Sequence, residues 1–177
     1  MRASSDWVVE PFSASRHIPD SFACGYEALD SYIRRYAGQD VKRRVSLVFV
    51  ACRGGEREIQ GYYTVSASSF RKDDLPAGLA KKLPHYPVPA AILGRLAVDR
   101  SCQGQGLGEY LLMNCFERVL QASELIAVHA IVADAKDERA KVFYERYGFQ
   151  AFVDEPLRLF IPMTTLEQLL VGRGTRR

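Results

Sequence analysis

The residues best suited to chemistry in this sequence form a glycine-rich run, Gln103-Gly104-Gln105-Gly106-Leu107-Gly108. Backbone N–H groups at the start of a helix have no acceptor within the helix, and the helix dipole favours negative charge there. Glycine also lets the backbone approach a bound group without interference from a Cβ atom. The run therefore predicts a pyrophosphate site, although its spacing matches neither the dinucleotide-binding nor the P-loop fingerprint. A tight strand–helix connection is the alternative reading of such a turn.

The segments around this run determine whether its glycines open a helix. An apolar strand precedes it, an amphipathic helix follows it, and the same strand–helix order then occurs again. Two parallel strands joined by a helix require a right-handed crossover. The expected strands of this half are residues 90–98, 126–132, 149–153 and 157–161, and the expected helices are 107–121, 137–147 (ended by Gly148) and 164–170.

The first half of the chain predicts antiparallel strands joined by a hairpin, together with helical segments. The fold class that follows is α/β, with a mixed central sheet flanked by helices. A proline-rich, irregular connection is expected at residues 71–89. The expected strands are Trp7–Pro11, 46–52 and 59–66, with a hairpin turn at 53–56, and the expected helices are 26–37, 39–43 and 77–81.

Length and composition indicate one ordinary soluble domain. The chain has 177 residues, of which 47% are hydrophobic and 25% charged, with a net charge of +3. No apolar run approaches the length of a membrane span, and the N-terminus lacks the apolar segment of a signal peptide, so we expect a cytoplasmic protein. Cys24, Cys52, Cys102 and Cys115 lack metal-ligand spacing, so we expect reduced thiols and no metal, with Cys102 partly exposed.

Three segments in order resemble the GNAT family of acetyl-CoA-dependent N-acetyltransferases. They are Arg95-Leu96-Ala97-Val98-Asp99-Arg100, the Gln-x-x-Gly-x-Gly core at Gln103, Gly106 and Gly108, and Phe143-Tyr144-Glu145-Arg146-Tyr147-Gly148-Phe149. In that family the first segment is the central strand, the second is the pyrophosphate loop, and the third ends the helix beside the thioester. The resemblance implies a single GNAT domain over residues 1–177, whose parallel strands splay apart to admit the pantetheine arm of acetyl-CoA.

The same resemblance assigns residues to the site. Tyr144 is the implied general acid, because a tyrosine pKa near 10 is close to that of the departing alkyl thiol. The competing interpretation is that Tyr144 packs in an aromatic cluster with Phe143, Tyr147 and Phe149. The implied cofactor-binding residues are Leu96, Ala97, Val98, Gln103, Gly104, Gln105, Gly106, Leu107, Gly108 and Phe143.

No general base stands out in the sequence. His17 and His129 read as structural or surface residues, and His85 lies in the proline-rich connection. An acceptor amine of low pKa needs no dedicated base. This observation favours an aminoacyl ester over lysine, whose unperturbed pKa is about 10.4.

Further segments are similar to one branch of that family, the GNAT toxins of bacterial toxin–antitoxin modules of the TacT and AtaT type. The similarity covers residues 22–33, Gln39-Asp40 with Lys42-Arg43-Arg44, and residues 157–163, and the whole match runs from about residue 8 to 170. Such toxins acetylate the α-amine of aminoacyl-tRNA and so stop translation. The implied partners are charged tRNA, a ribbon-helix-helix antitoxin and a second copy of the chain.

Basic clusters supply candidates for tRNA contact, which is led by charge and shape. Each cluster alone is also typical of a solvated surface. A basic C-terminal tail is expected at residues 172–177. The candidates are Arg34, Arg35, Lys42, Arg43, Arg44, Arg71, Lys72, Lys81 and Lys82.

Two other functions remain open from the sequence. One is a GNAT enzyme acting on a small amine, a polyamine or a protein N-terminus, which differs from the toxin only in its substrate cleft. The other is a non-catalytic module that binds acetyl-CoA or RNA. The glycine-rich run and Tyr144 argue against the second.

Overall fold

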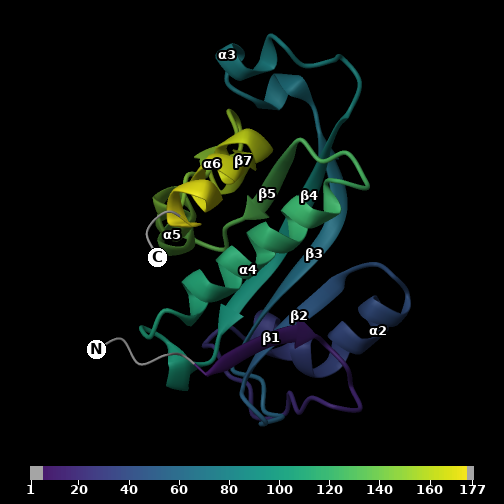
Figure 1. Cartoon of the computed structure of the whole chain (residues 1–177), viewed down its shortest axis with the longest axis vertical. Helices are drawn as coiled ribbons and strands as arrows, with labels where there is room; N and C mark the ends of the chain where they lie inside the picture. The colour runs from purple at the N-terminus through teal and green to yellow at the C-terminus, as the bar shows by residue number, and fades with distance from the viewer. Residues whose placement is uncertain (1–5, 175–177) are drawn as a thin grey trace. The chain divides into compact units, whose positions relative to one another are not determined.

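The computed structural model describes residues 6–174 and divides into two compact units. The first comprises Met1–Ser66 and Gly94–Cys115, and the second comprises Ala67–Leu93 and Phe116–Arg177. Strands β3 and β4 and helix α4 each run from one unit into the other. The strands hydrogen-bond in the order β1-β2-β3-β4-β5-β7-β6, which confirms the α/β class with a mixed sheet (Figure 1).

The antiparallel strands of the first unit are β1 (Trp7–Pro11), β2 (Leu47–Arg53) and β3 (Gly61–Phe70). Val9 pairs with Ala51, and Phe49 pairs with Tyr63. Gly55 provides the positive φ of the hairpin turn, +81°, as the sequence predicts. Strand β3 continues four residues beyond the predicted end at residue 66.

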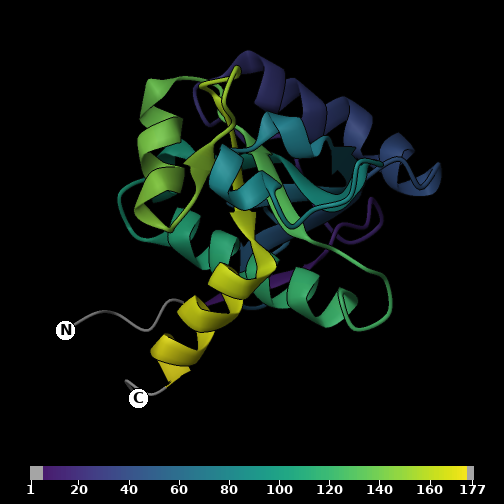
Figure 2. The same cartoon turned by 90° about the horizontal axis from the view of Figure 1, so that it is seen from above.

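One continuous helix replaces the two helices predicted for residues 26–43 (Figure 2, purple to blue). It consists of α1 (Glu27–Ser31), the π-helical turn η1 (Tyr32–Tyr36) and α2 (Ala37–Lys42). The N–H of Ala37 donates to the carbonyl of Tyr32, five residues back, so this turn holds an extra residue. Ala37 is buried in the core, whereas the neighbouring Tyr36 is 54% exposed.

Helix α4 (Leu107–Ala122) sits directly on β3 within the first unit. A Cβ atom built on Gly61 would lie 2.8 Å from Leu111 Cδ1, 3.1 Å from Leu107 Cδ2 and 3.3 Å from the carbonyl oxygen of Ala97. Because Leu107 and Leu111 are fully buried, the first turns of α4 are fixed by packing. The core beneath includes Phe22, Ile33, Val48, Val50, Ile59 and Tyr62.

In the second unit, β4 (Val88–Val98) pairs in parallel with β5 (Ala130–Asp134). Strand β5 pairs in antiparallel fashion with β7 (Arg158–Pro162), which also pairs with the short β6 (Gln150–Ala151). The core of this unit includes Phe70, Val88, Ala130, Val132, Phe152 and Phe160.

The predicted start of β5 at residue 126 is wrong. Leu125 is 90% exposed and Ile126 is 73% exposed. The N–H of Ile126 donates to the carbonyl of Ala122, so this apolar pair completes the turn that ends α4. Hydrophobicity alone therefore placed the strand four residues too early.

The remaining helices of the second unit are short except the last. Helix α5 (Glu138–Arg146) begins where Asp137 accepts a hydrogen bond from the Ala140 N–H at 2.8 Å. Gly148 follows it with φ +100°, the predicted C-terminal glycine.

A 3-10 turn η2 (Lys72–Asp74) and α3 (Ala77–Ala80) interrupt the irregular connection. Helix α6 (Met163–Gly174) is longer than predicted, and residues 175–177 of the expected basic tail lie outside the described residues.

We expect Gly61→Ala to destabilise the protein by about 1–3 kcal/mol, because the new methyl group would overlap the buried side chain of Leu111. Gly78→Ala is the matched control, since a Cβ on Gly78 meets no atom within 4 Å. Urea unfolding of both variants measures the effect. Equal free energies of unfolding for Gly61→Ala and the parent protein would contradict the close seating of α4 on β3.

Candidate functional site

The glycine turn opens α4 in the predicted manner. The carbonyl of Gly106 accepts the first helical hydrogen bond, from the Tyr110 N–H at 3.0 Å. Gly104 and Gly106 have φ values of +77° and +91°, where side chains are strained. A Cβ atom on either glycine would meet nothing within 4 Å, so the backbone here is open. This combination of open backbone and helix N-terminus fits a pyrophosphate group.

Two glutamine side chains brace this turn. The amide nitrogen of Gln103 donates to the carbonyls of Cys24 at 2.9 Å and Val98 at 3.0 Å. The amide nitrogen of Gln105 donates to the carbonyl of Ser101 at 2.9 Å. Both amides are engaged by the protein itself, so the turn offers its backbone to a ligand.

Asp99 holds the chain between β4 and the glycine turn. Its carboxylate accepts hydrogen bonds from the N–H and Oγ of Ser101, at 2.9 and 2.6 Å, and from the Ala23 N–H at 2.9 Å. Burial raises the pKa of Asp99, but the bonds from Ser101 and Ala23 outweigh it, so the pKa lies below its usual value. The ionised carboxylate therefore caps the 3-10 turn η3 (Arg100–Cys102).

Cys102 is buried, which corrects the expectation that it is partly exposed. Only 2% of the residue is accessible, and its Sγ lies 3.4 Å from Gln60 Oε1. The indole N–H of Trp7 donates to the same oxygen at 2.8 Å. All four cysteines are buried and none forms a disulfide, and burial raises the pKa of Cys52 to about 11 and that of Cys115 to about 12. They are inert core thiols.

The segment of β4 predicted to hold pantetheine runs past its parallel partner. The β4–β5 ladder ends with the pair Leu93 and Ala133, whereas β4 continues to Val98. The backbone of Leu96, Ala97 and Val98 therefore has no β5 partner in this ladder. Such an unpaired strand edge can accept an extended amide-containing chain.

Tyr144 lies in the second unit and belongs to an aromatic cluster. Its ring centroid is 5.4 Å from that of Phe143 and 5.2 Å from that of Phe149, and Phe143 is 5.2 Å from Tyr147. The Tyr144 carbonyl accepts the N–H groups of Tyr147 and Phe149 just beyond α5. The Tyr144 ring is therefore buried and held in one place by its aromatic neighbours, which leaves its role as the acid a prediction.

The histidines differ in their surroundings. His17 is buried, with Nδ1 accepting the Ser13 N–H at 3.0 Å and Nε2 lying 2.8 Å from Glu10 Oε1. These bonds define a structural histidine. The bond from His17, together with one from Arg16, lowers the pKa of Glu10. Burial lowers the pKa of the His129 imidazole. The backbone N–H of His129 donates to the Pro89 carbonyl. His85 is exposed, with Nε2 3.4 Å from Lys72 Nζ.

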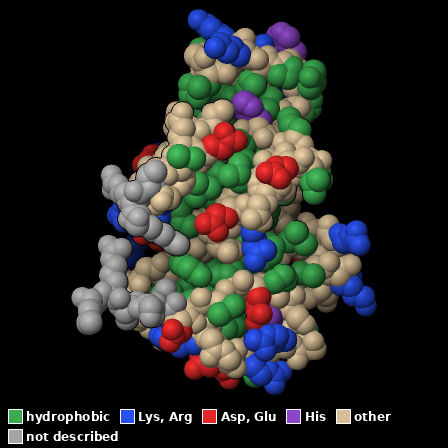
Figure 3. All heavy atoms as spheres, viewed as in Figure 1, with side chains coloured by type: hydrophobic (Ala, Val, Ile, Leu, Met, Phe, Trp, Pro, Cys, Tyr) green, Lys and Arg blue, Asp and Glu red, His purple; other side chains and the backbone are tan. Residues whose placement is uncertain are grey.

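The candidate tRNA contacts fall into two groups. Arg34, Arg35, Lys42, Arg43 and Arg44 belong to the first unit, and Arg71, Lys72, Lys81 and Lys82 belong to the second. All are exposed except the partly buried Lys72. Arg71 pairs with Asp73 at 3.8 Å. On the face shown in Figure 3, acidic side chains lie among the basic ones, so that face carries no single-sign surface.

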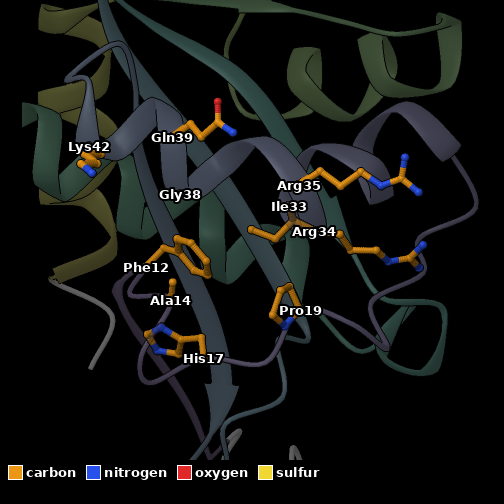
Figure 4. Close-up of a pocket in the computed structure, with 10 residues that line it drawn as sticks. All are labelled: Phe12, Ala14, His17, Pro19, Ile33, Arg34, Arg35, Gly38, Gln39 and Lys42. Atoms are coloured by element: carbon orange, nitrogen blue, oxygen red, sulfur yellow. The ribbon is translucent and has the colours of Figure 1, made fainter.

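Three of these residues line one groove in the first unit, of about 430 Å³. Its apolar side is formed by Phe12, Pro19 and Ile33, and Figure 4 shows Arg34 and Arg35 extending from one end with Lys42 at the other. The guanidinium of Arg34 donates to the carbonyl of Phe22. The groove therefore brings part of the predicted basic surface together.

A second cavity of the first unit was not predicted. It measures about 480 Å³. The continuous helix of α1, η1 and α2 forms one side of it, and strand β4 forms the other. Two signals were available in the sequence: an arginine within an apolar strand, and polar residues spaced by four along a helix. Its lining residues are Ala28, Ser31, Tyr32, Tyr36, Asp40 and Arg95.

Within residues 6–174, no three His, Cys, Asp or Glu side chains gather closely enough to hold a metal ion. In the same part of the chain, no helix has the length and apolar character needed to cross a membrane.

The chain matches known acetyltransferases along most of its length. Residues 44–151 match the family of the acetyltransferase (GNAT) domain. A tRNA-acetylating toxin of Mycobacterium tuberculosis is 35% identical over 164 residues, which cover 90% of this chain and 97% of that protein.

Two solved structures of AtaT show the same fold. AtaT complexed with acetyl-methionyl-tRNAfMet is 32% identical and superposes with a TM-score of 0.87, covering 93% of this chain and 99% of the AtaT chain. A tyrosine-to-phenylalanine mutant of AtaT has been solved with acetyl-CoA and the C-terminus of the antitoxin AtaR. It is 29% identical with a TM-score of 0.81, and the match covers 93% of this chain and 98% of the AtaT chain. The chain therefore belongs to the GNAT acetyltransferases, in the toxin–antitoxin branch of the TacT and AtaT type.

Proposed function

We propose that this protein acetylates the α-amine of aminoacyl-tRNA with acetyl-CoA, and so blocks translation as the toxin of a toxin–antitoxin pair. The observation that carries the proposal is the 32% identity, over 93% of the chain, to AtaT in complex with acetyl-methionyl-tRNAfMet. The open glycine turn at the N-terminus of a 16-residue helix supplies the matching anion site.

The chain binds acetyl-CoA through backbone groups. N–H groups from Gly104 to Gly108 receive the pyrophosphate, favoured by the dipole of α4, while Gln103 braces the turn through its side chain. The edge of β4 at Leu96, Ala97 and Val98 pairs with the amides of pantetheine, and the family resemblance assigns Phe143 to the cofactor-binding residues. Held in this way, the thioester presents its carbonyl carbon to the incoming amine.

In the transfer step, the amine nitrogen bonds to the acetyl carbonyl carbon and the carbon–sulfur bond breaks. The departing sulfur takes a proton from the hydroxyl of Tyr144, and the nitrogen gives up a proton to solvent. Phenols and alkyl thiols are acids of similar strength, which suits a tyrosine to protonate the departing sulfur. The ring contacts with Phe143 and Phe149 fix the direction of the Tyr144 side chain.

The α-amine of an aminoacyl ester suits a site without a dedicated base. A free α-amino group has a pKa of about 8, so a substantial fraction is already unprotonated near neutral pH. A lysine amine, with a pKa of about 10.4, would require a base. His17 cannot serve, because both of its ring nitrogens are occupied within the fold.

The partners follow from the branch. Charged tRNA binds through exposed arginines and lysines in contact with its phosphates. A ribbon-helix-helix antitoxin neutralises the toxin, which we propose to be a cytoplasmic homodimer. The AtaT complex with the C-terminus of AtaR supports neutralisation by a bound antitoxin segment.

We expect the purified protein to stop cell-free translation only when acetyl-CoA is supplied. Tyr144→Phe removes the donated proton and should lower the rate of acetyl transfer by about 10²–10⁴-fold. Its affinity for acetyl-CoA should stay within twofold, because the ring contacts are kept. Undiminished transfer by Tyr144→Phe would reject this residue as the acid, and full translation with the parent protein and acetyl-CoA would reject the toxin activity.

We expect the triple change Lys42→Glu, Arg43→Glu and Arg44→Glu to weaken charged-tRNA binding more than tenfold. Each basic side chain that contacts a phosphate releases counterions on binding, and the variant loses this contribution. The slope of binding against salt should also become shallower, while acetyl-CoA affinity is retained. The control is the triple variant Lys136→Glu, Arg139→Glu and Arg173→Glu. It changes the net charge by the same amount, at exposed positions outside the nine candidates. Equal tRNA affinity for the two triple variants would remove the residue 42–44 cluster from the interface.

A further inference from the structure

We propose that the cavity lined by Tyr32, Tyr36, Asp40 and Arg95 binds the terminal nucleoside of charged tRNA together with its attached amino acid. This inference rests on the proposed function, because it names the place where that acceptor sits. Its volume of about 480 Å³ falls within the range of small-molecule sites.

The π-helical turn builds one wall of the cavity. Ala28, Tyr32, Tyr36 and Asp40 are spaced by four, and in a regular α-helix each such step drifts by about 40° around the axis. The extra residue in η1 offsets this drift, so all four residues line the same cavity. The Tyr32 hydroxyl donates to Asp40 Oδ2 at 3.0 Å across two turns, which holds this face together.

Arg95 supplies the opposite wall from β4. Its guanidinium carbon lies 3.6 Å from the ring centroid of Tyr32, and the Tyr32 ring is stacked in turn on Tyr62. Among residues 6–174, this partly buried guanidinium makes no hydrogen bond and no ion pair. A partly buried cation held over an aromatic ring, with its N–H groups unused, is poised to bind an oxygen-rich ligand.

Arg95, Tyr36 and Asp40 each have a counterpart in an aminoacyl nucleoside. The guanidinium of Arg95 donates to ester and ribose oxygens, and the 54% exposed ring of Tyr36 stacks on the base. The carboxylate of Asp40 accepts a hydrogen bond from the neutral α-amine. Burial, together with the bond to Asp40, raises the pKa of Tyr32 to about 12, so this hydroxyl stays protonated and keeps donating to the carboxylate.

The position of Arg95 along β4 fits an acceptor site. It directly precedes Leu96, the first residue of the segment proposed to hold pantetheine. With a rise of about 3.3 Å per residue, Arg95 lies about 10 Å back along the strand from Val98, away from the glycine turn. An acceptor in this cavity therefore meets the acyl end of the extended arm and not its pyrophosphate end.

Other amines match the cavity less completely. A polyamine or a lysine side chain offers no oxygen to Arg95 and no flat ring to Tyr36. A free amino acid offers a carboxylate to Arg95 but again nothing to Tyr36. The nucleoside is therefore the part of charged tRNA that distinguishes it from these other amines in this cavity.

The test is the affinity for puromycin, in which a 4-methoxyphenylalanine with a free α-amine is joined to a modified adenosine. Calorimetric titration of the CoA-loaded protein avoids turnover. We expect Arg95→Ala and Tyr36→Ala each to weaken puromycin binding by about tenfold or more. Arg53→Ala is the matched control, because Arg53 also stacks on an aromatic ring of the first unit, 5.9 Å from the centroid of Trp7, outside the cavity. This control should bind puromycin like the parent protein.

Arg95→Lys keeps the charge but loses the planar pair of donors, and should bind with intermediate affinity. Thermal unfolding of every variant identifies any loss of puromycin affinity that comes from misfolding. Because Tyr36 is exposed, its replacement carries little risk of misfolding. The proposal is overturned if the parent protein fails to bind puromycin, or if folded Arg95 and Tyr36 variants bind it with parental affinity. Equal affinity for free 4-methoxyphenylalanine would also overturn it. Transfer of acetyl groups to charged tRNA by the parent protein is measured separately, so this cavity and the proposed function can fail independently.

Discussion

The packing of α4 onto β3 is the constraint on which the proposed cofactor site depends. At Gly61 there is no room for even one methyl group, because Leu111 and the backbone of Ala97 already occupy the space. The helix therefore begins at a fixed place beside the end of β4. The N–H groups of its first turn, which have no acceptor within the helix, and the open glycines before it are placed by this packing, so the proposed anion site needs no charged side chain to locate it.

Hydrogen bonds then stiffen the turn that the packing has placed. Gln103, Gln105 and Asp99 all bond to neighbouring backbone groups, so the side chains around the glycines support the backbone that would bind the ligand. Strand β4 connects this turn to the second cavity, because Arg95 and Leu96 are consecutive residues. One strand thus carries both the segment proposed for pantetheine and the cation proposed for the acceptor.

The sequence was sufficient wherever a local signal determined the local structure. The start of α4, the hairpin at Gly55 and the C-terminal Gly148 follow from glycine conformation and apolar spacing. Long-range contacts decided the rest: Leu125 and Ile126 resemble a strand but have no partner, and Cys102 is buried by Gln60, which is distant in sequence. The π turn arises from one additional residue that helical periodicity does not reveal, so the cavity at Tyr36 and Arg95 was missed. The roles proposed for Tyr144 and the basic clusters remain predictions.

The most direct measurement is transfer of labelled acetyl from acetyl-CoA to pooled tRNA, either charged or stripped of its amino acids. We predict label on the charged pool alone, released by mild alkali together with the amino acid as an N-acetyl derivative. Label on the stripped pool, or no label on either pool while acetyl-CoA is still bound, would contradict it and direct attention to a small amine or a protein as the acceptor.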